Sequence, residues 1–374
     1  MRRESPTSVI FCLFLACAAA SQNATPAKPL VTRPGIPPGK LIASHDMTTA
    51  RGGHTATPLP DFKVLIAGGK QERGIVLATT EIYDPTTETF SPAAKMLVPR
   101  EGHVAASLSD GKILIAGGAT RGGIPLSSCE DYDFEAETFT ARGNMHARRV
   151  HAAATALRDG RILVTGGEDG DLPLASAELY NVLDGKWTLA GKMATPRANH
   201  TATLLSDGRV LIAGGTGSHH AALAGAEIFD PKTNKFTPAG NLHEARSSHT
   251  AALLSNGAVL IAGGAGGADH LPLASAEIYS PATNSFSTTG SLAEARLKIP
   301  DSTALLDGRV LIVGGAATAE VYDPRTGSFH TVDGSLDTAR YYPAALQLMD
   351  GTTRIFGGYD SKGISTAKTW IYRP

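Results

Sequence analysis

The sequence is short of cysteine: its 374 residues contain three, Cys12, Cys17 and Cys129. Two of them lie in an apolar N-terminal stretch that has the pattern of a removable leader, which leaves Cys129 alone in the rest of the chain. A single cysteine excludes an intrachain disulfide and a zinc site built from cysteines.

Charge of either sign is not in excess. Lys and Arg number 34 against 35 Asp and Glu, which gives a formal net charge of -1. No global field therefore favours nucleic acid or an anionic membrane, and we expect no nucleic-acid partner. Aromatic residues are also few, at 6%, whereas glycine is abundant, at 41 residues. This balance is typical of many short strands joined by tight turns.

No apolar run approaches the about 18 residues that a membrane-spanning helix needs. The longest, residues 9–16, follows two arginines and precedes three alanines, a pattern that predicts a signal peptide over residues 1–20. We therefore expect an exported protein of the periplasm, cell envelope or extracellular space. Residues 14–17 also resemble a bacterial lipobox, so lipidation of Cys17 is an alternative to simple cleavage. The proline-rich residues 21–38 are expected to form an extended spacer.

Signatures of common enzyme classes are absent. The chain has no Gly-x-Ser-x-Gly, no His-Glu-x-x-His and no phosphate-binding loop ending in Gly-Lys-Ser or Gly-Lys-Thr. The acidic loop at residues 168–171 is too short for an EF-hand and is expected to be solvated. The sequence therefore predicts no metal site and no cofactor.

What the sequence has in quantity is internal repetition. A Gly-Gly pair closes an apolar run seven times, at intervals of 43 to 51 residues. The first glycines of these pairs are Gly68, Gly117, Gly166, Gly214, Gly263, Gly314 and Gly357. A period near 50 residues is typical of propeller blades. The repeats predict a single domain over residues 39–374, although length alone suggests two or three.

Each unit contains four strand-like segments. The first follows an arginine, and the second is the apolar run, whose near-continuous apolar character predicts burial on both faces. Between them an Asp-Gly or Asn-Gly pair is expected to form a two-residue hairpin turn, except in the first unit, where Asp61-Phe62 predicts a different turn. The third segment carries a glutamate and an aromatic residue and ends at an Asp-Pro-type turn, and the fourth centres on an aromatic residue.

These features, in phase with one another, resemble the kelch repeat. Its hallmarks are Gly-Gly after an apolar strand, an aromatic residue in the third strand and Trp or Phe in the fourth. The fourth-strand residues here are Phe90, Phe139, Trp187, Phe236, Phe286 and Phe329. The resemblance, which extends to kelch proteins exported by bacteria, implies an all-β fold: a seven-bladed β-propeller of four-stranded antiparallel blades.

The two ends of the repeat predict how the ring closes. The seventh unit stops at residues 370–374, just after its third segment, so its fourth is missing. Leu41 stands six residues before Met47, as Phe236 stands six residues before Leu242. We therefore expect an N-terminal strand to complete the last blade and to remove an open edge.

Function is expected on the face that carries the loops between strands two and three and between strands four and one, because these loops vary. Each unit places an arginine on this face, just before its first strand: Arg51, Arg100, Arg148, Arg197, Arg246, Arg296 and Arg340. These guanidiniums would hold a carboxylate or phosphate at the channel mouth, or each would pair with the glutamate of a third strand. The pairing is favoured, because a feature of every blade serves the repeat. Since Trp370 replaces the seventh glutamate, Arg340 is expected to lack that partner.

Histidines also recur. Five units place one three positions after the arginine: His54, His103, His151, His200 and His249. Side chains of an innermost strand point between blades, so packed, hydrogen-bonded histidines are expected and a metal ring is not.

The predicted binding quadrant is where the symmetry breaks. Unit six has the shortest loop, residues 316–319, which lowers the wall of the channel there. Aromatic and charged residues gather around it, a mixture that suits a sugar or a peptide. The candidate binding residues are Arg340, Tyr341, Tyr342, Tyr359, Asp360, Lys362, Arg296, Asp269, His270, His219 and His220.

Two functions remain open at this point. The favoured one is a monomeric, cofactor-free scaffold that recognises a peptide, a protein or a glycan. The alternative is a copper-dependent carbohydrate oxidase, because the catalytic domain of galactose oxidase is a kelch propeller. That chemistry uses copper, two tyrosines, two histidines and a cysteine crosslinked to a tyrosine. Cys129 is the one cysteine left for it, and the expected role of Cys129 is that of a small buried hydrophobe.

Overall fold

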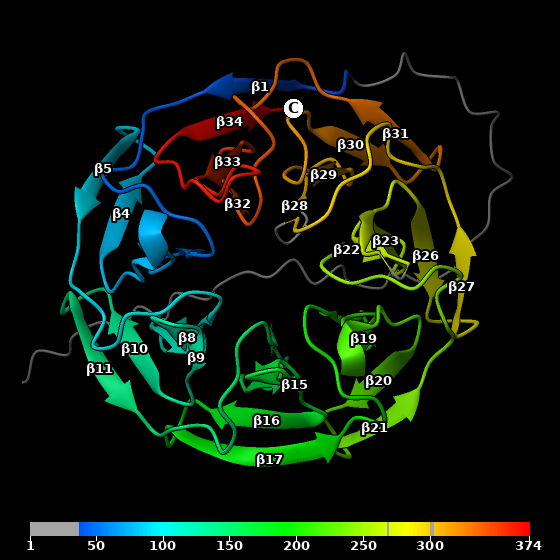
Figure 1. Ribbon diagram of the computed structural model, residues 1–374, viewed down its shortest axis with the longest axis horizontal. Helices are drawn as coiled ribbons and strands as arrows, with labels where there is room; N and C mark the ends of the chain where they lie inside the picture. The colour runs from blue at the N-terminus through cyan, green and yellow to red at the C-terminus, as the bar shows by residue number, and fades with distance from the viewer. Residues whose placement is uncertain (1–36, 268, 300–302) are drawn as a thin grey trace, which may run out of the picture. The chain divides into compact units, whose positions relative to one another are not determined.

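The computed structural model describes residues 37–267, 269–299 and 303–374. Across these residues the strands form seven four-stranded antiparallel sheets, arranged as blades around a central hole (Figure 1). This confirms the predicted β-propeller. The expected signal peptide, the lipidation candidate Cys17 and residues 21–36 of the expected spacer lie outside the described residues. In the described part of the chain, no helix is long and apolar enough to cross a membrane.

In blades one to three, the strands follow one another in sequence order from the central channel to the outer edge. Blade one comprises β2 (Thr55–Pro58), β3 (Val64–Ala67), β4 (Thr80–Asp84) and β5 (Thr89–Pro92). Blade two comprises β6 (Val104–Ser107), β7 (Ile113–Ala116), β10 (Cys129–Asp133) and β11 (Thr138–Arg142). Blade three comprises β12 (Ala153–Ala156), β13 (Ile162–Thr165), β16 (Ser176–Asn181) and β17 (Lys186–Lys192).

Blades four to seven repeat the pattern, and only the last departs from sequence order. Blade four comprises β18 (Thr201–Leu204), β19 (Val210–Ala213), β20 (Ala226–Asp230) and β21 (Lys235–Pro238). Blade five comprises β22 (Thr250–Leu253), β23 (Val259–Ala262), β26 (Ala276–Ser280) and β27 (Ser285–Thr288). Blade six comprises β28 (Thr303–Ala304), β29 (Val310–Ile312), β30 (Glu320–Asp323) and β31 (Ser328–Thr331). Blade seven comprises β32 (Ala344–Gln347), β33 (Thr353–Phe356), β34 (Thr369–Arg373) and β1 (Lys40–Ala43).

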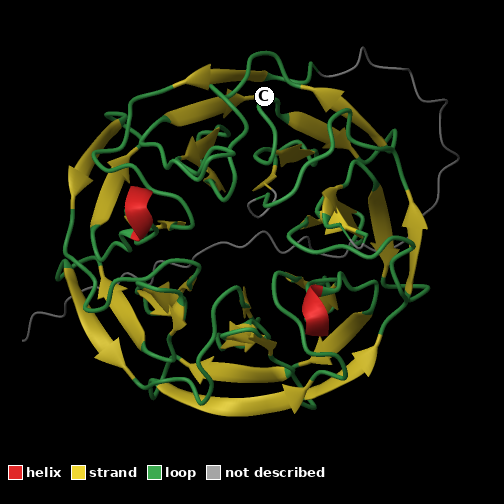
Figure 2. Ribbon diagram, in the orientation of Figure 1, coloured by secondary structure: helices red, strands yellow, loops and turns green. Residues whose placement is uncertain are grey.

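The loops between the second and third strands carry small elements of their own (Figure 2). Three contain two-stranded hairpins: β8 (Ala119–Thr120) with β9 (Ile124–Pro125), β14 (Glu168–Asp169) with β15 (Leu172–Pro173), and β24 (Ala265–Gly266) with β25 (Leu271–Pro272). Two contain single 3-10 turns, η1 (Glu72–Gly74) and η2 (Ser218–His220).

The apolar second strands are buried because each blade is stacked between two others. All four residues of β3 and of β13 are buried, for example. The described core consists of seven clusters, and each joins neighbouring blades. One contains Val64 and Ile66 of blade one with Ala344 and Phe356 of blade seven. The hydrophobic core is therefore spread around the ring between blades, and the centre stays free for a channel.

The predicted closure is confirmed. Strand β1 pairs antiparallel with β34, so that Leu41 lies opposite Tyr372. Leu41 is buried in the cluster between blades six and seven, together with Tyr372 and Trp370. The hydroxyl of Tyr372 donates to the carbonyl of Pro38 at 2.9 Å, which fixes the entry of the strand. A strand from one end of the chain and three from the other thus form one blade.

The turns between strands one and two differ from the expected two-residue hairpins. In blade two, the N–H of Gly111 donates to Leu108 and the N–H of Leu108 donates to Lys112, so three residues form the loop. Gly111 has a φ of +86°, as such a loop requires. The prediction of a different turn in blade one was also wrong. Phe62 takes the glycine position with a φ of +68° and makes the same backbone hydrogen bond.

The Gly-Gly pairs are required by close approach between blades. A Cβ on Gly68 would lie 2.5 Å from the carbonyl oxygen of Arg100 in the next blade, and one on Gly69 would lie 2.8 Å from that of Gly52. Both glycines also have positive φ, at +65° and +89°. A side chain at Gly68 would therefore push adjacent blades apart, and one at Gly69 would displace the loop before the first strand of its own blade.

Candidate functional site at the mouth of the channel

The repeat arginines are structural. In blade one, the guanidinium of Arg51 donates to the carbonyl of Gly68 at 2.7 Å and to Glu81 at 2.7 Å. The described residues contain six such buried pairs: Arg51–Glu81, Arg100–Glu130, Arg149–Glu178, Arg197–Glu227, Arg246–Glu277 and Arg296–Glu320. The favoured interpretation, pairing with the third-strand glutamates, is therefore confirmed. These guanidiniums, that of Arg296 included, are buried within the blades and do not encircle the mouth.

Two details of the arginine prediction need correction. In blade three the buried arginine is Arg149, whereas Arg148 is exposed and pairs with Asp169 at 3.3 Å. In blade seven, Arg340 indeed has no third-strand glutamate, but it is not free. Its guanidinium donates to Asp337 at 2.7 and 2.9 Å and is buried.

Four of the five histidines pack between blades as expected. Nε2 of His103 and of His249 lies 3.0 Å from a threonine hydroxyl of the preceding blade, Thr55 and Thr201 respectively. Burial lowers the pKa of both to about 3, so they are neutral. His54 differs, because both of its ring nitrogens are buried without a hydrogen-bond partner.

His54 lacks a hydrogen-bond partner because blade seven has no threonine at the position that supplies one to His103 and His249. Ala344 occupies in blade seven the position that Thr55 occupies in blade one. It lies on β32, which neighbours the first strand of blade one. We expect Ala344→Thr to supply the missing hydroxyl and to raise the free energy of unfolding by about 1 kcal/mol, as a typical hydrogen bond does. Urea unfolding measures this, with Ala344→Val as the control of equal shape. An equal gain from valine would assign the effect to packing.

The mouth of the channel is built from a closed ring of backbone hydrogen bonds. Two residues after each repeat arginine, an N–H donates to the carbonyl of the equivalent residue in the preceding blade, at 2.9 to 3.3 Å. The seven residues, all described, are Gly53, Gly102, His151, Asn199, Ser248, Lys298 and Tyr342. All have left-handed backbones, with φ between +49° and +63°. Because their N–H groups are used within the ring, ligand contacts there fall to the side chains.

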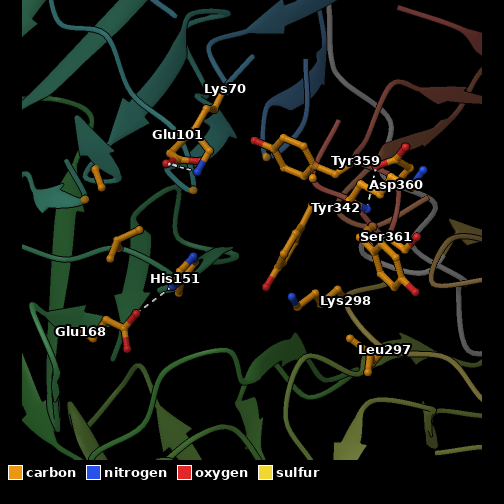
Figure 3. A pocket seen from close by; sticks show the side chains of 18 of the residues that line it. Lys70, Glu101, His151, Glu168, Leu297, Lys298, Tyr342, Tyr359, Asp360 and Ser361 are labelled. Carbon is orange, nitrogen blue, oxygen red and sulfur yellow. Dashed lines mark hydrogen bonds and ion pairs between the residues drawn. The ribbon is translucent and has the colours of Figure 1, made fainter. Parts of the chain in front are cut away.

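The side chains at this one position differ between blades, and this makes the mouth asymmetric. Blades one and two carry glycine, which opens space on their side. His151, Lys298 and Tyr342 project from blades three, six and seven toward a common cavity (Figure 3). The packed histidines stand three residues after their repeat arginines, whereas His151 stands two residues after Arg149. His151 therefore lies in the ring of hydrogen bonds and does not pack between blades as the others do.

A cavity of about 870 Å³ lies over the ring and adjoins a channel of about 600 Å³. Its wall contains a second set of equivalent positions, two residues after the first glycine of each Gly-Gly pair. Lys70, Glu168 and Tyr359 line the cavity from these positions. Backbone bridges join them to the loop before the first strand, for example Tyr341 to Tyr359.

Two ion pairs lie in the wall of the cavity. Lys70 contacts Glu101 at 2.8 Å, and Nδ1 of His151 lies 2.9 Å from Glu168. Burial raises the pKa of Tyr359, which keeps its hydroxyl neutral and donating to Gly52 at 2.7 Å. These contacts make the cavity polar and locally rigid.

The structure brings together five of the predicted site residues. Tyr341, Tyr342, Tyr359, Asp360 and Lys362 line the cavity. The predicted residues that do not line it are the buried Arg340 and Arg296 and the exposed Asp269, His270, His219 and His220.

Sequence reasoning missed several residues of the cavity. Lys70, Glu101 and Lys298 were not considered, His151 was assigned to packing, and Glu168 to a solvated loop. The signal was present in the repeat itself. At the two offsets described above, glycine, alanine or serine fill some units and large polar residues fill others.

Comparison with known proteins agrees with this geometry. The family model of the Kelch motif matches residues 148–194 and 196–243, which span blades three and four. The chain is a seven-bladed β-propeller that contains Kelch motifs. No curated protein matches it. A solved structure described as a novel fungal alcohol oxidase with catalytic diversity among the AA5 family, in complex with copper, matches with a TM-score of 0.72 and 19% sequence identity. The match covers 90% of this chain and 76% of that chain, and at this identity it shows the fold alone.

The residues of this kelch propeller do not fit the copper donor set of an oxidase. Its mouth cavity is lined by three tyrosines, but His151 is the one histidine among the described lining residues and no cysteine is present there. Cys129 lies on β10, buried in the cluster between blades two and three. Among the residues that the structure describes, no group of three or more His, Cys, Asp or Glu could hold a metal ion. The described lining of the mouth cavity therefore supplies binding groups but not this donor set.

Proposed function

We propose that this kelch propeller binds an extended segment of a partner protein in its mouth cavity. The observation that carries the proposal is the broken symmetry of the ring, where Gly53 and Gly102 give way to His151, Lys298 and Tyr342. A left-handed backbone costs a residue with a Cβ about 1 kcal/mol. Large side chains held there at a cost in stability, and directed into a cavity, are expected to contact a ligand.

A protein partner is favoured over a glycan by the rim of the cavity. Ile124, Leu172 and Ile364 follow directly on the lining residues Gly123, Asp171 and Gly363. Their side chains are 54%, 71% and 42% exposed. Aliphatic groups offer a glycan neither hydrogen bonds nor stacking, whereas they bury apolar surface against the side chains of a protein segment. Kelch propellers generally bind proteins, which points the same way.

The test begins with peptides selected on the full chain from a random display library. We expect them to bind Tyr342→Gly at least about tenfold more weakly, because an aromatic anchor contributes more than 1 kcal/mol. Asn199→Gly is the matched control, since it occupies the same ring position and does not line the cavity. Failure to enrich any peptide, together with binding on a glycan array, would reject a protein ligand. Equal losses in both variants would place the site elsewhere.

A further inference from the structure

Lys298 differs from the other cations of the cavity. Lys70 and His151 are occupied by Glu101 and Glu168, at 2.8 and 2.9 Å. Among the described residues, none forms an ion pair with Lys298. An exposed ammonium that no described carboxylate pairs with, on the wall of a cavity, is available to an incoming anion.

The ammonium of Lys298 is nevertheless held in place. Its Nζ lies 5.6 Å from the centre of the Tyr342 ring, and both side chains extend into the cavity (Figure 3). A cation–π contact orients the ammonium, but it does not use its three N–H donors, and no acceptor among the described residues binds them. Among the described residues, Lys362 makes no such ring contact. It lies near Asp360, whose pKa is lowered mainly by the backbone N–H of Ile364 and to a smaller extent by Lys362.

Charge is also unevenly distributed across the mouth. Glu101, Glu168 and Asp171 line the cavity from blades two and three, and Asp360 lines it from blade seven together with Lys362. Lys298 projects from blade six, away from the acids of blades two and three. A ligand with an anionic group is therefore attracted by Lys298 and repelled from blades two and three.

The backbone of Lys298 supports a binding role. Its φ is +54°, in the region that glycine adopts freely and other residues do not. Gly53 and Gly102 occupy the equivalent ring position in blades one and two. Glycine would satisfy the ring hydrogen bond equally well, so the lysine side chain adds nothing to closure.

We propose that Lys298 binds an oxyanion of the ligand, a carboxylate or a phosphate, while the Tyr342 ring packs against an adjacent planar or apolar group. The inference rests on the proposed function, because the ligand enters the same cavity. For a peptide ligand, it assigns to Lys298 an acidic side chain or a free C-terminal carboxylate.

The first test uses small probes and the full chain. Benzoate combines a carboxylate with a planar ring, and benzamide is its neutral counterpart of nearly equal shape. We expect benzoate, and not benzamide, to shift the amide resonances of Lys298 and Tyr342 in a titration. If inorganic phosphate competes with benzoate, the oxyanion alone suffices for binding. If it does not compete, binding also requires the planar ring. Equal binding of benzoate and benzamide would overturn the proposal.

Variants of Lys298 distinguish a role of its charge in ligand binding from a role in the stability of the fold. Lys298→Met is expected to weaken benzoate binding at least about fivefold, and Lys298→Arg to retain it. The control Lys232→Met, at an exposed lysine that does not line the cavity, is expected to leave it unchanged. Lys298→Gly is expected to lose binding while raising the melting temperature by about 1–3 °C, since glycine relieves the left-handed backbone. Loss of binding together with a lower melting temperature would indicate a structural role and contradict the proposal.

The same variants distinguish failure of this inference from failure of the proposed function. Display-selected peptides that bind Lys298→Met as tightly as the parent chain, yet bind Tyr342→Gly weakly, would reject the anion site alone. Selected peptides are expected to lose affinity for Lys298→Met and, when their carboxylates are amidated, for the parent chain as well.

Discussion

Replacing Arg149 by methionine is expected to lower the free energy of unfolding by about 3–5 kcal/mol, because it leaves the carboxylate of Glu178 buried without its cation. Arg149 and Glu178 are 1% and 0% exposed, and their side chains meet at 2.6 Å. The guanidinium also donates to the carbonyl of Gly166 at 2.6 Å, so the substitution removes a tie between the first and second strands of blade three. Urea unfolding followed by tryptophan fluorescence measures the loss.

The neighbouring Arg148 provides the matched control. Its side chain is 57% exposed, and its ion pair with Asp169 spans 3.3 Å at the surface. The same substitution there is expected to change stability by no more than about 0.5 kcal/mol. Similar losses from both variants would mean that Arg149 is not the buried member of the pair.

A charge inside the closing strand is expected to open the ring. Leu41 is 3% exposed in the cluster that joins blades six and seven. Leu41→Asp removes its apolar contacts and buries a carboxylate without a partner, and we expect a loss of about 4 kcal/mol or more. Thermal unfolding and limited proteolysis of the full chain measure it, with cleavage expected first near β1 and β34.

Ala43→Asp is the control for this prediction, because Ala43 is exposed on the same strand. It is expected to change stability by no more than about 0.5 kcal/mol. If Leu41→Asp were tolerated as well as Ala43→Asp, β1 would not close the ring in solution.

The fold could be predicted almost completely, because each of its determinants is local and repeated. The Gly-Gly pairs, the apolar second strands and the paired aromatics, such as Tyr83 with Phe90 at 4.8 Å, recur in register. The closing strand could be predicted from spacing alone. The turn geometry could not, since Phe62 adopts a left-handed backbone that its side chain disfavours.

The site could be predicted only in part. Its residues are found by counting from the repeat arginine of each blade, and in blade three either of two adjacent arginines could be that residue. Blade three offers both Arg148 and Arg149, and the choice of the first placed His151 in the wrong role. The buried arginines of blades one to five each bind the Gly-Gly carbonyl 17 residues later, a spacing that selects Arg149. The cavity itself arises from side chains of blades distant in sequence, which no local pattern brings together.

The ring of hydrogen bonds has an electrostatic consequence. Each N–H in the ring points along the circumference toward the preceding blade, as that of Gly53 points toward the carbonyl of Tyr342. All seven therefore point in the same sense around the circle. In a helix, aligned peptide dipoles add up along the axis, but around a closed circle their vectors sum to zero. The backbone of the ring therefore gives the mouth no net dipole of its own, and the potential that an approaching partner meets there is set by the side chains.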